Sequence, residues 1–146
     1  MLILFILLVS LLIFRGLGLL GVQWFSSWVA ATRYALAVML AFTASAHFTR
    51  MKNDLMRMVP HWVPWPRSMV YFTGVCELAG AIGLLIPSLR TAAGIALIIF
   101  FILVFPANVK AAQAEVTLGG RAATPLWLRL PMQLLFIALT SWSTFS

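Results

Sequence analysis

The sequence predicts an all-α integral membrane protein, built as a compact bundle of four transmembrane helices with an additional N-terminal span. Of its 146 residues, 63% are hydrophobic and only 9% are charged, and the mean hydropathy is +1.04. A water-soluble domain of this size does not need so much apolar surface. Nearly the whole length is required for spans and short loops, so no room remains for a separately folded soluble domain.

Five apolar segments are expected to form helices, at residues 2–24, 34–48, 68–87, 91–108 and 126–142. Crossing a hydrocarbon core takes about 20 helical residues, with a range of about 17–25, so the second and fifth segments are short for spans. The N-terminus lacks the basic region of a cleavable signal peptide. We therefore expect residues 1–32 to be a retained N-terminal span and 33–146 the main bundle. An interfacial first segment with four spans is the alternative.

The basic residues predict the orientation of the bundle. They gather after the second segment (Arg50, Lys52, Arg57, Arg67) and after the fourth (Lys110, Arg121), whereas the opposite side has only Arg33 and Arg90. Loops rich in Lys and Arg stay in the cytoplasm. This pattern predicts a multi-pass protein of the bacterial cytoplasmic (inner) membrane, with the N-terminus inside and the C-terminus outside. The net charge of +7 then reflects orientation and does not point to nucleic acid.

The stretch 50–67 is expected to be an interfacial segment on the cytoplasmic side. Its apolar residues recur at helical spacing between basic ones, which is typical of a short helix lying at a membrane surface. Three prolines then end that helix before the next span. Trp62 and Trp65 are expected to sit at the headgroup level, as aromatic-belt residues do.

The most informative single residue is Glu77, near the middle of the third apolar segment. An acid at the centre of a bilayer costs about 3 to more than 10 kcal/mol unless it is paired, hydrated or protonated. Small residues flank it at helical spacing (Thr73, Gly74, Gly80, Ala81), which indicates an interior face that another helix can approach.

Other polar residues lie toward the same cytoplasmic half. His47 ends the second segment, Asn108 ends the fourth, and Arg129 and Gln133 share one face of the fifth because they are four residues apart. Lone polar groups in lipid are unfavourable. We therefore expect all five side chains to turn inward and form one polar pocket, open toward the cytoplasmic leaflet.

Each of these residues also has a purely structural interpretation. Glu77 could pair with Arg129 or Arg15 and fix helix register, His47 could be a helix-end hydrogen-bond partner, and Asn108 could satisfy carbonyls freed by Pro106. Arg129 could extend to the interface, and Gln133 could hydrogen-bond across helices.

Metal and thiol chemistry are less well supported. Methionines between His47 and His61 offer thioethers that suit Cu(I), but methionine is a common filler of amphipathic segments, so we predict no metal site. The single Cys76 cannot form an internal disulfide.

Four ordered motifs carry a family resemblance: HFTRMKNDLMRMVPHWVPWP, TGVCELAGAIGLLIP, FPANV and LRLPMQ. From about Arg33 onward the chain resembles the DoxX family of small bacterial membrane proteins. In that family His47, Glu77, Asn108, Arg129 and Gln133 match recurrent polar positions. The resemblance implies a four-helix bundle and a link to membrane redox or oxidative-stress complexes, since the family takes its name from a subunit associated with a thiosulfate:quinone oxidoreductase.

The leading functional hypothesis is an accessory subunit that is not catalytic on its own. It has no intrinsic cofactor, and its pocket binds a quinone-like or lipid-like molecule or a partner helix. The chain has no cysteine pair, haem ligand pair or flavin fingerprint. The alternatives are a subunit of a quinone-linked oxidoreductase, a membrane-protein assembly chaperone and a proton-coupled small transporter. The sequence is compatible with binding to a membrane or redox partner protein, and with a homo-oligomer.

Overall fold

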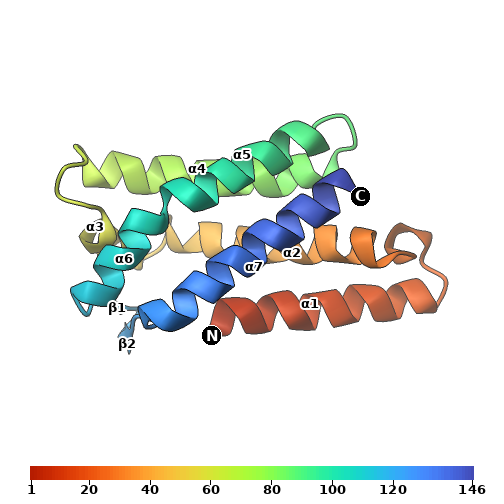
Figure 1. The fold of residues 1–146 in the computed structure, drawn as a ribbon, viewed down its shortest axis with the longest axis horizontal. Coiled ribbons are helices and arrows are strands. Elements are labelled where there is room, and N and C mark those ends of the chain that lie inside the picture. The colour runs from red at the N-terminus through yellow and green to blue at the C-terminus, as the bar shows by residue number, and fades with distance from the viewer.

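The structure is a computed structural model that describes residues 1–146. Its long helices are α1 (Leu2–Leu19), α2 (Trp28–Ala46), α4 (Pro66–Leu85), α5 (Arg90–Leu103) and α7 (Leu126–Phe145). Helices α1, α2 and α4 run along the long axis of the molecule, whereas α5 and α7 are inclined to it (Figure 1). The shorter elements are a 3₁₀ turn η1 (Gln23–Phe25), α3 (Lys52–Met58), α6 (Phe105–Gln113), and strands β1 (Thr117–Leu118) and β2 (Arg121–Ala122).

The prediction of an all-α protein is confirmed, apart from one small hairpin. Four helical segments are long and apolar enough to cross a membrane: α1, α2, α4 and the α5–α6 rod, Arg90–Gln113. Helix α7 has 20 residues but is not among these four, because polar residues in both of its halves lower its hydropathy.

The bounds of the first two predicted segments were wrong. Helix α1 ends at Leu19, because the chain turns at Gly21, whose φ of +102° is a left-handed conformation open to glycine. Helix α2 begins at Trp28 rather than at residue 34, because the Ser27 hydroxyl accepts a hydrogen bond from the Ala30 N–H at 3.1 Å and caps the helix.

The fourth predicted segment divides into α5 and α6 at Val104. Pro106 lies in the first turn of α6 and has no N–H to donate back to α5. The helix therefore breaks there instead of ending at Asn108.

The two basic loops meet at one end of the bundle, together with α3, α6 and the hairpin (Figure 1). The Asp54 carboxylate accepts a hydrogen bond from the Gly119 N–H at 3.0 Å, and Lys110 Nζ donates to the Val59 carbonyl at 2.5 Å. Helix α3 forms within the predicted interfacial segment and buries Met58 against Ala111 and Val116. We call this region, residues 47–65 and 105–125, the basic end.

The hairpin was not predicted from the sequence. Gly119 and Gly120 connect its strands with φ of +58° and +78°. Two consecutive residues with positive φ match the tight turn that joins antiparallel strands with the least distortion.

The main core lies between α2, α4, α5 and α7. Leu36, Leu40, Leu84 and Leu97 are at most 1% exposed, and α1 inserts only Leu7 fully into this cluster. The outward faces remain apolar as well, with Phe5, Phe72 and Leu103 more than half exposed. Apolar residues on both faces are typical of helices that lie in lipid.

Candidate functional site

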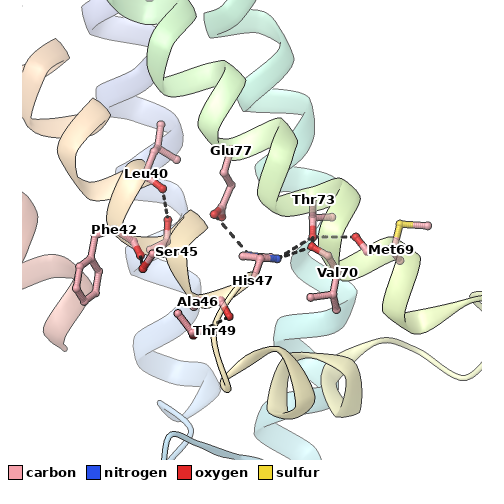
Figure 2. Close-up of polar contacts among 11 residues, drawn as sticks. Leu40, Phe42, Ser45, Ala46, His47, Thr49, Met69, Val70, Thr73 and Glu77 are labelled. Atoms are coloured by element: carbon pink, nitrogen blue, oxygen red, sulfur yellow. Dashed lines mark hydrogen bonds and ion pairs between the residues drawn. The ribbon is translucent and has the colours of Figure 1, made fainter.

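His47 and Glu77 face each other across the contact between α2 and α4 (Figure 2). His47 follows the last residue of α2, and Glu77 lies in the middle of α4. The imidazole Nε2 is 3.6 Å from the Glu77 Oε2, and the two side chains are 13% and 12% exposed. The prediction that Glu77 turns inward is therefore confirmed, and its charge-bearing neighbour is a histidine.

The hydrogen bonds of His47 define which ring nitrogen carries a proton. Nδ1 lies 2.7 Å from the Val70 carbonyl, which can only accept. Nδ1 also lies 3.2 Å from the hydroxyl of Thr73, which itself donates to carbonyls of its own helix. Nδ1 is therefore the protonated nitrogen, and in the neutral ring Nε2 presents a lone pair to Glu77.

This geometry couples the protonation of the two residues, which lie 3.6 Å apart. A carboxylate facing the Nε2 lone pair would place two acceptors against each other. One proton between them removes that conflict, either on Glu77 or on Nε2. Glu77 Oε2 is fully buried and makes no hydrogen bond, because 3.6 Å is longer than such a bond. The Thr43 hydroxyl is a neighbour of the Glu77 carboxyl, but it donates to the Leu40 carbonyl at 3.0 Å, so Oε2 keeps unused hydrogen-bonding capacity.

His47 lies one residue beyond the candidate span 28–46. Burial lowers the pKa of the His47 imidazole, and its hydrogen bond to the Val70 carbonyl acts in the opposite direction. The larger of the two effects is burial, so the neutral form with Nδ1–H is favoured.

Gly74 permits this close approach of α2 to α4. A Cβ at this position would lie 2.5 Å from the Cβ of His47, which is a steric overlap. The predicted small-residue face around Glu77 is confirmed, since Gly74, Gly80 and Ala81 are buried.

An apolar groove of about 220 Å³ runs along the same two helices. Its eight lining residues are all hydrophobic and come from 34–41 of α2 and 78–85 of α4. Neither His47 nor Glu77 lines the groove itself, whose residue Ala81 is one helical turn from Glu77.

Asn108, Arg129 and Gln133 form a second polar group, between α6 and α7. Arg129 Nη1 donates to the Asn108 Oδ1 at 2.8 Å, and Asn108 Nδ2 donates to the Gln133 Oε1 at 3.3 Å. The predicted shared face of Arg129 and Gln133 is thus confirmed. Together with Ile3, Met132 and Phe136, these three residues line a pocket of about 90 Å³.

Gln133 connects this group to the break between α5 and α6. Its Nε2 donates to the Phe101 carbonyl, which receives no backbone hydrogen bond across the break. The amide therefore satisfies an acceptor that the break leaves free, as buried backbone groups require. It also fixes α7 against α5.

The five predicted residues thus form two groups rather than one pocket. No hydrogen bond or ion pair joins His47 and Glu77 to the group around Arg129, and only that group lines the small pocket. The physical reason is the rotation of each helix about its own axis. Glu77 lies on the face of α4 that packs against α2, whereas Arg129 and Gln133 lie on the face of α7 that meets α6.

Neither arginine suggested as a partner of Glu77 contacts it. Arg15 donates to the Ser26 carbonyl at 2.9 Å and lies over the Trp28 ring, 5.3 Å from its centroid. Arg129 is held by Asn108 and by the Thr124 carbonyl, 2.7 Å from its Nε. The suggested pairing of Glu77 with either arginine was wrong.

Trp62 and Trp65 lie in the loop between α3 and α4, and are 68% and 77% exposed. Trp65 adopts a left-handed φ of +52°, directly before Pro66 opens α4. Their exposure at the basic end suits aromatic rings that contact a membrane surface.

A buried polar layer between α2 and α7 was not predicted from the sequence. Arg33 was assigned to a loop, but it lies in α2, is 9% exposed and donates to the Ser143 carbonyl at 2.7 and 3.2 Å. Thr32, Thr140 and Thr144 are buried beside it with hydroxyls that make no hydrogen bond. The four-residue spacing of Thr140 and Thr144, which places both on one face of α7, is the sequence feature that could have predicted this layer.

Comparison with known families gives one match. Residues 36–144 match a family described as "Domain of unknown function (DUF8561)". The match includes both polar groups and leaves α1 outside. No curated protein and no solved structure matches the chain.

Proposed function

Because the chain belongs to the DUF8561 family, whose description gives no function, we propose from the site itself that it is a membrane accessory protein. It binds an apolar molecule with a polar head, quinone-like or lipid-like, at the His47–Glu77 pair. The observation that carries the proposal is the buried Glu77 Oε2, which has no hydrogen bond and belongs to a residue one helical turn from Ala81 of the apolar groove.

The chemistry of the two parts is complementary. The groove offers only hydrophobic contacts to the body of a ligand. The pair offers one proton, which a carbonyl head can accept, and one lone pair, to which a hydroxyl head can donate. A ligand oxygen bound to Glu77 would relieve the cost of a polar atom buried without a partner, about 1–3 kcal/mol.

The family that matches is DUF8561, and we further propose that the chain is related to the DoxX family. Its motif stretch TGVCELAGAIGLLIP contains Glu77 and part of the groove. The proposal extends to the accessory role in membrane redox or stress-response complexes that the resemblance implies. It also places the basic end in the bacterial cytoplasm, with the N-terminus inside and the C-terminus outside.

The test is purification in a mild, uncharged detergent, followed by mass spectrometry of every retained lipid, quinone and protein. We expect a defined small molecule with the wild type, and its loss with Glu77→Gln. The control is Glu115→Gln, which makes the same chemical change at an exposed loop residue. Equal recovery of the same molecules from all three proteins would refute the proposal.

A partner helix is the second candidate occupant of the groove. Ala37 and Ala41, four residues apart, both line it, and small residues at this spacing permit close helix packing. In the same experiment, a membrane protein recovered in fixed proportion, with no small molecule, supports this candidate. A coloured, redox-active partner supports a quinone-linked oxidoreductase subunit.

A further inference from the structure

We propose that the pocket beside Arg129 binds the phosphate group of an anionic membrane lipid. This site is distinct from the His47–Glu77 pair. The inference rests on the proposed insertion in a membrane, and does not depend on the ligand proposed for that pair.

The charge of Arg129 has no acidic partner. The only ion pairs are His47 with Glu77 and Arg57 with Asp54, so Arg129 is held by neutral acceptors alone, the Thr124 carbonyl and Asn108. A guanidinium has five N–H donors, and only two of them make these bonds. A half-buried cation with three free donors lacks a counterion.

The environment orients the guanidinium for a ligand. Nε and Nη1 are fixed by their acceptors, and Asn108 is in turn fixed by Gln133, which is bound to the Phe101 carbonyl. Asn108 and Gln133 are therefore positioning residues. The planar guanidinium presents paired donors, which match the oxygens of a phosphate group.

The size of the pocket selects the chemical class of the ligand. Sites for drug-sized molecules measure about 300–1,000 Å³, whereas this pocket measures about 90 Å³. It therefore admits a small group such as a phosphate and excludes a ring system. Its remaining wall is apolar, from Ile3, Met132 and Phe136, and suits the glycerol and first acyl carbons of a lipid.

The position of Arg129 agrees with this ligand. Arg129 lies in the first turn of α7, which begins at the basic end (Figure 1). The proposed orientation puts this end at the cytoplasmic leaflet, whose anionic headgroups attract basic residues by about 1 kcal/mol each. A lipid phosphate there can compensate Arg129 while its acyl chains stay in the hydrocarbon.

The experiment uses the full chain, stripped of lipid, in an uncharged detergent. Calorimetric titration is made with short-chain phosphatidic acid and, separately, with inorganic phosphate. We expect the lipid to bind the wild type, and Arg129→Gln to bind it at least about tenfold more weakly, because a charged hydrogen bond is lost. Arg50→Gln removes the same charge from an exposed residue of the basic end and should bind like the wild type.

Three results would overturn the proposal. These are no binding of the lipid to the wild type, equal affinity of Arg129→Gln and Arg50→Gln, or inorganic phosphate binding as tightly as the lipid, which would exclude a lipid as the specific ligand. If Arg129→Gln does not fold, Arg129→Lys decides, because it keeps the charge but loses the paired donors. We expect weaker binding by Arg129→Lys, and unchanged affinity would contradict the proposal.

Discussion

Gly74 of α4 lies so close to His47 that no side chain fits between them: a Cβ on Gly74 would be 2.5 Å from the His47 Cβ and 2.9 Å from its Cγ. This approach brings the imidazole to the Val70 carbonyl on one side and to Glu77 on the other. A residue without a side chain thus makes the histidine–acid pair possible.

Replacing Gly74 should therefore separate the pair. We expect Gly74→Ala to lower the free energy of unfolding by about 1–3 kcal/mol, since the added methyl overpacks the α2–α4 contact. Denaturant unfolding in detergent measures this change. The matched control is Gly16→Ala in α1, where nothing lies within 4 Å of the added Cβ. The control should be neutral or gain up to about 1 kcal/mol from helix propensity, and an equal loss in both variants would contradict the overlap.

At the pH at which an exposed imidazole is half protonated, the His47 ring should be mostly neutral. Burial lowers its pKa, so at pH 6.5, the ordinary value for a histidine, the neutral ring should predominate. Its protonation should require more acidic pH. ¹⁵N NMR of labelled histidine in His61→Gln isolates the His47 signal and reports the tautomer. We expect the proton on Nδ1, and a ring more than half protonated at pH 6.5, or protonated only on Nε2, would contradict the geometry.

Gln133 should contribute more than an average hydrogen bond between membrane helices, which is about 0.6 kcal/mol. Gln133→Leu removes the donor to the Phe101 carbonyl and the acceptor of Asn108. We expect a loss of about 1–3 kcal/mol, because buried groups are left without partners. Gln113→Leu makes the same change at an exposed position of α6 and should have little effect. Equal stability of the two variants in denaturant unfolding would exclude the structural role of Gln133.

Arg33 should hold the last turn of α7 against α2. The last carbonyls of a helix lack donors within the helix, and Arg33 supplies two hydrogen bonds to that of Ser143. We expect Arg33→Gln to increase amide hydrogen exchange at residues 140–145 by at least about tenfold, since one or two charged hydrogen bonds are worth about 1.5–3 kcal/mol each. Arg90→Gln, at the same end of the bundle, loses only a 3.4 Å contact with the Leu84 carbonyl. An equal exchange rate in both variants would show that Arg33 does not hold this turn.

The sequence by itself determined the helical architecture and the depth of its polar residues. Hydropathy located the long helices to within a few residues, except where a turn at Gly21, a cap at Ser27 or a proline at residue 106 moved a boundary. The small neighbours of Glu77 at helical spacing correctly predicted that its side chain faces inward. Spacing of four residues correctly placed Arg129 and Gln133 on one face. These inferences succeed because they depend on periodicity within one helix.

Only the tertiary structure decided which polar groups meet. Depth says how far a residue lies along the bundle, but gives no information about which neighbour a helix faces. In the structure His47 lies beside Glu77, and Asn108 contacts Arg129 and Gln133. The five residues therefore form two sites and not the single pocket that was expected. Arg33 became buried for the same reason, because the Ser143 carbonyl that it binds is 110 residues away in the chain. Contacts between helices depend on how each one is rotated in the bundle, and that rotation is set by the packing of all of them together.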